Sequence, residues 1–329
     1  MSTPAFDVSI ILVSFNTESL TRECLQAVLE ETKGLTAEIF VVDNASRDDS
    51  ASMIEREFPQ VRLFRSNVNL GFGNANNVAL KEATGRYIVL LNTDAFLAPG
   101  GLRLAMERMD ATPRCGMGGA RLIGRDGGWQ PSARTFHGLW VDATVLTGLS
   151  TRYPHSRLFG GLDRTWADQN VAAAVDWVPG AFAILRPKAL AQVGAFDPAF
   201  FLYYEEVDLC YRLKQARWEI WYWPEIVVTH IGGESSRSLK TLEFSSAAAQ
   251  VVLWRMRSTL LYYRKHHGEK ARLAKWMEQL LYTASAWRND LSSTPERKAR
   301  AHHFKTLSRL FDQAWDETKG GRISPPAPW

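Results

Sequence analysis

The chain has 329 residues, of which 46% are hydrophobic and 22% charged, and this composition excludes a disordered or fibrous protein. Its net charge of +4 is too small to indicate a nucleic-acid-binding protein. The three cysteines, Cys24, Cys115 and Cys210, are far apart, which argues against a disulfide framework or a zinc cluster and favours a reducing compartment, expected to be the cytoplasm.

The first third of the chain alternates between strand and helix patterns. Apolar runs predict strands near residues 8–15, 38–43, 61–66 and 86–94, with helical patterns over 18–32, 49–58 and 74–84 between them. This alternation predicts an α/β fold with a doubly wound sheet. Ligands of such sheets bind beyond the carboxyl ends of the strands, so polar residues there are the first functional candidates.

The pattern weakens over residues 116–176, where we expect further strands and a long excursion that faces the substrate. A strand pair around a Pro-Gly turn is predicted from Trp177, and a helix with acidic residues in its first turn over 204–217. The chain then becomes helical from about Leu239, with Thr294 marking a second helix start.

Three strand ends carry polar candidates. Asp43 can accept a hydrogen bond from a nucleobase ring N–H, with Asn44 beside it, or it can cap the next helix in an Asx-turn. Asp94 can hold a hard cation that bridges two phosphates, or it can start a turn. The segment 67–77 lacks the third glycine of a dinucleotide fingerprint, which argues against hydride transfer, but it suits contact with a nucleotide or a structural helix cap.

An acidic cluster opens the helix predicted at 204–217. Helical spacing places Glu205 and Asp208 on one face and Glu206 on another, so the three acids cannot share one role. An acid among aromatic residues can have its pKa raised, which makes Glu206 the candidate general base. A salt bridge from Asp208 to Arg212 and a helix-start charge at Glu205 are the structural alternatives.

His230 ends an apolar run and precedes Gly232 and Gly233. A strand-end imidazole beside a glycine loop can be a metal ligand, and a hydrogen-bonded structural histidine is the alternative. Because His230 and Asp94 are distant in the sequence, a shared cation requires the fold to bring them together.

Six segments in order, ILVSFN, VVDNAS, NLGFGNANN, LLNTD, EEVDL and THIGG, resemble the family 2 glycosyltransferases of the GT-A fold. The resemblance is strongest to the rhamnosyltransferase-like branch that builds bacterial surface polysaccharides such as O-antigen and lipopolysaccharide. It runs from about Val8 to Ser236 and continues at YYRKHHG from Tyr262. It implies a catalytic domain over 1–236, with a nucleotide-binding half (1–115) and an acceptor or catalytic half (116–236), followed by a helical region over 237–329.

The resemblance also implies a nucleotide-sugar donor and a divalent cation. Asp94 and His230 would hold Mg²⁺ or Mn²⁺, although Asn92 replaces the first acid of the family's metal motif. The donor would be bound at the strand ends by Ser14, Phe15, Asn16, Asp43, Asn44, Asn69, Gly71, Asn74, Asn77, Asn92, Thr93 and Asp94.

Glu206 matches the catalytic base of the family's paired acidic motif, where many relatives carry Asp, with Glu205 and Asp208 as its orienting neighbours. Aromatic faces suit sugar rings, so an acceptor platform is expected. Its candidate residues, which core packing explains equally well, are Trp177, Gly180, Tyr203 and Tyr204.

We therefore expect an inverting, metal-dependent glycosyltransferase that moves L-rhamnose from dTDP-rhamnose to a glycan or a polyprenyl-diphosphate-linked acceptor. Transfer of galactose or galactofuranose from a UDP carrier is one alternative. A catalytically silent sugar- or nucleotide-binding module is another.

A basic, aromatic stretch over residues 255–276 can rest on an anionic membrane surface, at the inner face of the cytoplasmic membrane. Helix packing against the catalytic domain or a homodimer contact explains the same composition. The apolar runs are too short to cross a bilayer, and we expect no targeting segment.

Overall fold

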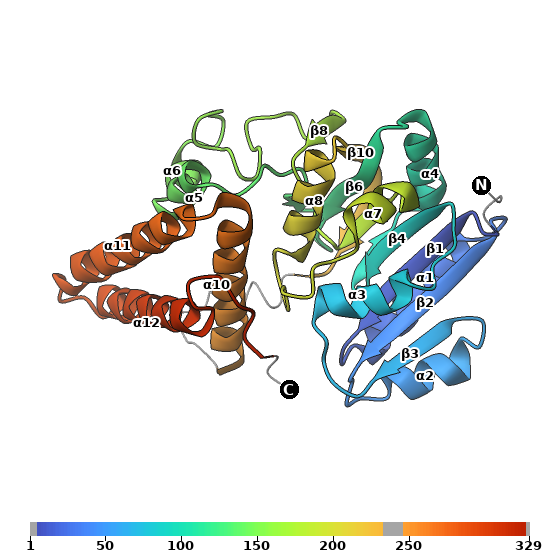
Figure 1. Ribbon diagram of the computed structural model, residues 1–329, viewed down its shortest axis with the longest axis horizontal. Coiled ribbons are helices and arrows are strands. Elements are labelled where there is room, and N and C mark those ends of the chain that lie inside the picture. Colours follow the sequence, from blue (N-terminus) through green and yellow to red (C-terminus); the bar gives the residue numbers. More distant parts are fainter. Residues whose placement is uncertain (1–4, 233–245, 327–329) are drawn as a thin grey trace.

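The computed structural model describes residues 5–232 and 246–326. Gly233, the predicted helical onset at Leu239 and the domain boundary predicted after residue 236 lie outside these residues. A twisted sheet covered by helices forms the larger part of the molecule, and the long helices of the C-terminal region lie beside it (Figure 1).

Four parallel strands form the N-terminal half of the sheet in the order β3-β2-β1-β4. The central strands are buried on both faces, as their unbroken apolar sequences predict. These four strands confirm the strand predictions for the first third of the chain, and their bounds are β1 (Val8–Ser14), β2 (Ala37–Asn44), β3 (Arg62–Ser66) and β4 (Tyr87–Asn92).

Antiparallel pairings extend the sheet beyond β4 in the order β9-β6-β10-β5, so the sheet is mixed. Its further strands are β5 (Ala95–Leu97), β6 (Cys115–Ile123), β7 (Trp129–Gln130), β8 (Ala173–Val175), β9 (Phe182–Leu185) and β10 (Glu219–His230). The strand pair predicted from Trp177 is wrong. Trp177 makes an isolated bridge with Arg134, and β9 inserts between β4 and β6, so its partners come from distant sequence rather than from a hairpin.

Alternate strand residues face opposite layers of helices. Ile10 and Leu12 belong to a core shared with α1, α2 and α4, whereas Ile11 belongs to a core shared with α3, α7 and α8. The helix predicted from Asn74 begins at Phe72 instead, directly after Gly71. The helix bounds are α1 (Glu18–Glu31), α2 (Ser50–Glu57), α3 (Phe72–Leu80), α4 (Gly101–Ala111), α5 (Leu139–Leu146), α6 (Leu149–Arg152), α7 (Pro187–Val193) and α8 (Glu205–Gln215).

The C-terminal region contains α10 (Ser246–His267), α11 (Lys270–Asp290) and α12 (Pro295–Glu317), the last starting where Thr294 predicts it. These helices enclose their own small core. In addition, α10 packs on the sheet region, where Tyr262 and Tyr263 are fully buried. For the α10 part of the stretch 255–276, helix packing therefore accounts for the aromatic residues.

Cys24, Cys115 and Cys210 are buried thiols, as their spacing predicts. Burial raises the pKa of each thiol well above its usual range. Across residues 5–232 and 246–326, no helix is both long and apolar enough to span a membrane.

Candidate active site

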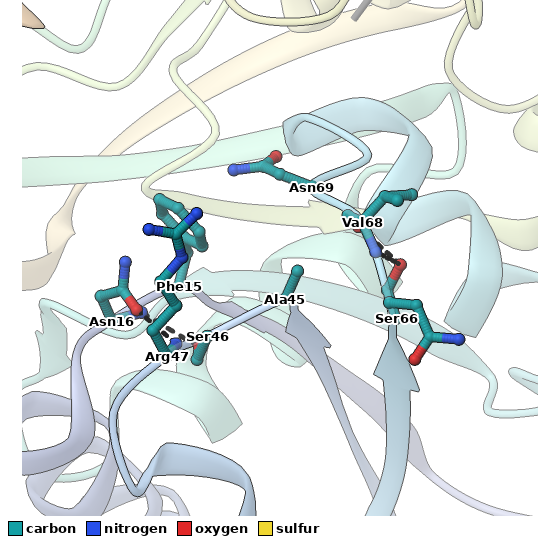
Figure 2. Close-up of a pocket in the computed structure, with 9 residues that line it drawn as sticks. Phe15, Asn16, Ala45, Ser46, Arg47, Ser66, Val68 and Asn69 are labelled. Atoms are coloured by element: carbon teal, nitrogen blue, oxygen red, sulfur yellow. Dashed lines mark hydrogen bonds between the residues drawn. The ribbon is translucent and has the colours of Figure 1, made fainter. Parts of the chain in front are cut away.

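A cavity of about 730 Å³ opens at the carboxyl ends of β1, β2 and β3 (Figure 2). Phe15, Asn16 and Arg47 stand on one side of the opening, and Val68 and Asn69 stand on the other. This is the edge at which a doubly wound sheet binds its ligands. Together with these five residues, the lining consists of Ala45, Ser46, Ser66 and Asn67.

The loops after β1 and β2 are tied together at this cavity. Asn16 and Ala45 both adopt positive φ angles, 54° and 67°, which are uncommon for residues with a side chain and cluster at functional sites. The Asn16 backbone N–H donates to Ser46 Oγ (3.0 Å), and Asn16 Oδ1 accepts from the Arg47 backbone N–H (2.7 Å). The loops are thus held in one shape before any ligand binds.

Asp43 and Asn44 at the end of β2 have different surroundings. Asp43 Oδ2 accepts from the Ser46 backbone N–H (3.2 Å), whereas its buried Oδ1 has no hydrogen-bond partner among the residues that the structure describes. This oxygen can accept a hydrogen bond from a ring N–H, although Asp43 is not among the residues that line the cavity. Asn44 instead binds the next loop, since it accepts from Leu70 N (2.7 Å) and donates to Gly71 O (3.2 Å).

Several residues predicted to bind the donor instead make hydrogen bonds within the protein. Ser14 is buried with its Oγ 3.0 Å from Thr21 Oγ1. Asn77 exchanges two hydrogen bonds with the Phe196 backbone (2.8 and 3.0 Å), and Asn74 donates to Pro198 O (3.4 Å). These contacts fasten α3 to the segment that leads into α8.

Gly71 allows the loop between β3 and α3 to approach that same segment. Its φ is +78°, and a Cβ on it would lie 1.9 Å from the Phe201 carbonyl oxygen. The Phe72 backbone N–H donates to this oxygen (3.1 Å). Only glycine fits the position, which explains the glycine recognised in the sequence.

Asp94 and His230 lie side by side although 136 positions separate them in the chain. Strand β5 pairs antiparallel with the end of β10, with Ala95 opposite His230. The Ile231 backbone N–H donates to Asp94 O (2.9 Å), and Asp94 Oδ1 is 3.5 Å from His230 Nε2.

Gln130 determines which nitrogen of His230 is available. Its Nε2 donates to the His230 carbonyl (2.9 Å), so its Oε1 faces His230 Nδ1 (2.9 Å). Nδ1 must then carry a proton, so that in the neutral imidazole the lone pair is on Nε2, which faces the Asp94 carboxylate. Two electron-pair donors face each other, an arrangement that a divalent cation satisfies.

Gly232 leaves space in front of these two donors. A Cβ at Gly232 would lie 2.4 Å from His230 Nε2 and 2.9 Å from Asp94 Oδ2. In the described part of the chain, no group of three or more acidic, histidine or cysteine side chains is placed to hold a metal. A cation on Asp94 and His230 would therefore keep positions open for oxygens of the substrate or water.

Replacing Gln130 with alanine is expected to weaken Mn²⁺ binding by about 10–100-fold, the usual effect of losing the hydrogen-bond partner of a ligating histidine. Titration calorimetry with MnCl₂ alone measures this, and Gln313→Ala on the exposed surface of α12 is the control. Unchanged affinity in the Gln130 variant would contradict the positioning role.

A short backbone path connects the Asp94 pair with Glu206. The Asn92 N–H, at the end of β4, donates to Ala181 O (3.0 Å). The neighbouring Gly180 N–H is a hydrogen-bond donor to the Glu206 carboxyl group. Thr93, between Asn92 and Asp94, is buried with its Oγ1 3.2 Å from Thr17 Oγ1.

Glu205 and Glu206 at the start of α8 face different surroundings. Glu205 is buried, and burial together with the neighbouring Glu206 charge raises its pKa well above the usual range. Burial also raises the pKa of Glu206, while hydrogen bonding and the cationic charge of Arg134 and His137 oppose the rise. Two adjacent carboxyl groups in a low dielectric favour one shared charge, and the larger rise at Glu205 together with the Arg134 cation near Glu206 favours the anion at Glu206.

Asp208 has the structural role that the spacing to Arg212 predicts. Its buried carboxylate accepts from Arg212 Nε (2.8 Å) and is bonded by Lys265 Nζ (2.6 Å) and His266 Nε2 (2.7 Å) of α10. Burial opposes ionisation, but these three partners lower the pKa of Asp208 to about 2. The cluster fastens α8, and with it Glu206, to the C-terminal region.

A second cavity of about 400 Å³ is lined by Glu206 together with Trp177, Tyr203 and Tyr204. Both tyrosines have positive φ angles, 67° and 68°, directly before the two glutamates. Consecutive strained residues of this kind persist only where their surroundings hold them. Gly180 does not line the cavity, and a Cβ on it would lie 2.9 Å from the Phe72 ring.

The chain is similar to known glycosyltransferases. The family profile described as "Glycosyl transferase family 2" matches residues 9–168. An N-acetylglucosaminyl-diphospho-decaprenol L-rhamnosyltransferase of Mycobacterium tuberculosis is 30% identical over 205 residues, which are 58% of this chain and 66% of the relative. The chain contains a glycosyl transferase family 2 domain.

One further relative and one solved structure are similar to this chain. Rhamnosyltransferase WbbL of Escherichia coli K12 is 25% identical over 209 residues, 58% of this chain and 69% of that protein. The structure of mannosyltransferase PcManGT from Pyrobaculum calidifontis, in complex with GDP-Man and Mn²⁺, aligns with a TM-score of 0.57 at 16% identity, covering 95% of this chain and 89% of that one. The GT-A fold with a helical C-terminal region is confirmed.

Several residues that line the two cavities or bind His230 carry no sequence signal. Arg47 and Gln130 lie in loops or short strands without a motif, and Arg134 and His137 lie in the stretch where the pattern weakens. Arg255 and Glu278 lie on α10 and α11. The apolar periodicity of these helices predicts packing and gives no indication of a cavity. A polar residue within an apolar helix face is the one cue that the sequence offers for Glu278.

Proposed function

We propose that this protein transfers L-rhamnose from dTDP-rhamnose to a sugar acceptor, with inversion, in the synthesis of a cell-surface polysaccharide. The observation that carries the proposal is Glu206, a carboxyl group that lines the 400 Å³ cavity, in a chain whose fold also brings Asp94 and His230 together. The names of the two relatives, both rhamnosyltransferases, support the choice of sugar. The match covers slightly under two thirds of the mycobacterial relative, so its acceptor is a guide for testing.

The donor nucleotide is assigned to the cavity at the ends of β1, β2 and β3. The unpartnered Oδ1 of Asp43 suits the ring N–H of thymine, and the exposed guanidinium of Arg47 suits a phosphate. Phe15, Asn16 and Asn69 line the same cavity. Uracil presents the same N–H, so a UDP-sugar is the rival donor.

Asp94 and His230 would hold Mn²⁺ or Mg²⁺ next to the donor diphosphate. When bound, the cation stabilises the negative charge that develops on the leaving diphosphate as a Lewis acid. Gln130 keeps the His230 ring in the orientation and tautomer that this requires.

Glu206 accepts the proton of the attacking acceptor hydroxyl. General-base catalysis of this kind contributes about 10²–10⁴ in rate. The neutral, buried Glu205 prevents a second negative charge beside the base, and the Asp208 cluster holds α8 in place. Acceptor binding is assigned to the 400 Å³ cavity with Trp177, Tyr203 and Tyr204.

Donor choice is tested by thermal shift and by transfer. A ligand at 100 times its Kd stabilises the folded protein by about 2.7 kcal/mol, and at equal concentration the ligand with the lowest Kd stabilises it most. With Mn²⁺ present, dTDP-rhamnose should therefore raise Tm more than the same concentration of UDP-galactose or dTDP-glucose does. Transfer to N-acetylglucosaminyl diphosphate carrying a short alkyl chain is followed by mass spectrometry. A larger shift and turnover with UDP-galactose would replace the donor, and binding without any turnover would indicate a silent module.

We further propose that α11 rests on an anionic lipid surface. Its solvent-exposed face carries an apolar stripe at helical spacing, led by Trp276 and Trp287, which are 74% and 65% exposed. Exposed Arg272 and Arg288 flank the two tryptophans, which complements anionic headgroups. The other members of the stripe are Leu273, Leu280 and Leu291.

Replacing Trp276 and Trp287 together with serine is expected to abolish sedimentation with vesicles that contain phosphatidylglycerol. Wild-type protein should sediment at low salt and progressively less as salt rises. Wild type that stays in the supernatant at low salt refutes the lipid contact, and dimerisation lost in the double variant would assign the stripe to a second copy instead.

A further inference from the structure

The cavity that contains Glu206 is completed by the C-terminal helices. Arg255, Met256 and Thr259 of α10 and Glu278 and Tyr282 of α11 line it together with residues of the catalytic part. The Ser258 hydroxyl donates to Leu202 O (2.8 Å), which joins α10 to the loop just before the strained tyrosines. The wall is therefore a fixed part of the cavity.

Glu278 is the acidic residue among those that α10 and α11 contribute to this wall. The Tyr282 hydroxyl donates to Glu278 Oε2 (3.0 Å), and within residues 5–232 and 246–326 no hydrogen-bond partner is found for Oε1. Burial raises the pKa of Glu278 to about 7, with Asp142 adding to the rise and Arg255 opposing it. Above that pH, a carboxylate faces the cavity with an oxygen available.

The fold does not account for this acid. Asp142, the other acid from a neighbouring helix, is satisfied at both oxygens, by His137 Nδ1 (2.8 Å) and by the Tyr263 hydroxyl (2.5 Å). Among the residues that the structure describes, Glu278 has no such partner for its second oxygen, and the nearby Asp142 raises its energy as an anion. An apolar side chain would close the wall without that cost.

Resting on the glycosyl transfer proposed above, we propose that Glu278 binds the acceptor: its carboxylate accepts hydrogen bonds from hydroxyl groups of the acceptor sugar. The C-terminal helices thereby set acceptor specificity. The reacting hydroxyl lies at Glu206, and hydroxyls elsewhere on the same acceptor are bound at Glu278.

The chemistry of the cavity fits a sugar. Carboxylates accept strong hydrogen bonds from hydroxyls, and aromatic side chains such as Trp177 and Tyr203 offer faces to the C–H groups of a sugar ring. The volume of about 400 Å³ lies in the range of small-molecule sites. Glu206 and Glu278 come from separate parts of the chain, so one ligand can be held from two sides.

The test measures acceptor affinity apart from turnover. Short-chain alkyl N-acetylglucosaminyl diphosphate is titrated by calorimetry into the full chain with dTDP present, at pH 8, where Glu278 is ionised. Glu278→Gln removes the charge at nearly constant shape, and hydrogen bonds to a charged group contribute about 1.5–3 kcal/mol, so affinity should fall about 10–100-fold. The affinity for dTDP and the Tm should match wild type.

Matched variants separate the possible outcomes. Glu296→Gln, exposed on α12, should bind the probe as wild type does, and Glu206→Gln should lose kcat while keeping acceptor affinity. Wild-type acceptor affinity in Glu278→Gln overturns the inference and leaves the proposed function standing. Wild type that binds the probe through Glu278 but transfers no sugar overturns the proposed function alone.

Discussion

Glu206→Gln is expected to lower kcat by about 10²–10⁴, because a carboxamide cannot accept the proton of the attacking hydroxyl. Donor binding should be unchanged, since the cavity assigned to the donor is lined by residues at the ends of β1, β2 and β3 and not by α8. Initial rates of rhamnosyl transfer give kcat, and the Tm shift with dTDP reports donor binding. Glu107→Gln, on the exposed face of α4, is the control and should turn over as wild type does.

The pH profile of the wild type tests the same role. Burial raises the folded-state pKa of Glu206 above the usual glutamate value of about 4.3, and the active form is the anion. Activity must therefore rise with pH as Glu206 loses its proton, with the acidic limb displaced upward from pH 4.3. An unshifted limb, or a Glu206→Gln enzyme with wild-type kcat, contradicts the assignment.

Asp94→Asn is expected to lower kcat/KM by about 10²–10³, because a neutral amide binds a divalent cation much more weakly than a carboxylate does. A contribution of several kcal/mol to charge stabilisation corresponds to this range at 1.36 kcal/mol per tenfold change. Direct titration with MnCl₂ should show a loss of Mn²⁺ affinity larger than that of the Gln130→Ala variant, which is expected to be about 10–100-fold because Gln130 binds His230 and not the cation.

Two comparisons make the Asp94 result specific. Asp316→Asn, exposed on α12, should bind Mn²⁺ and turn over as wild type does. Chelation of the wild type with EDTA should reduce turnover to the Asp94→Asn level, and added Mn²⁺ should restore it. Full Mn²⁺ affinity in Asp94→Asn would show that the cation binds elsewhere.

The alternation of strands and helices up to residue 94 could be predicted because local patterns specify it. Periodicity identified β1 through β4, and helix-start signals identified the start of α12 at Thr294. Residues 116–176 were harder to interpret, since β7 and β8 are short edge pieces, paired with β6 and β10, and the helices α5 and α6 are short. The strand pair predicted from Trp177 failed because the partners of β9 lie 64 or more residues away.

The predicted site residues divided in a way that local sequence could not reveal. Asp43 and Asn44 are adjacent in the chain, yet one has an unpartnered oxygen and the other holds a loop. Asn74 and Asn77 look like ligand contacts in the sequence, but they bind backbone groups around residues 196–198. Whether an amide meets a ligand or a neighbouring loop depends on which loop packs against it.

The sequence alone determined the α/β class, the polar residues at the strand ends and the family resemblance. Each of these depends on short segments whose residues are close together along the chain. Only the tertiary structure decided that His230 meets Asp94, that Gln130 selects the ring nitrogen, and that Glu278 shares a cavity with Glu206. Those contacts depend on the antiparallel register of β5 with β10 and on the packing of α10 and α11, which join segments dozens of residues or more apart.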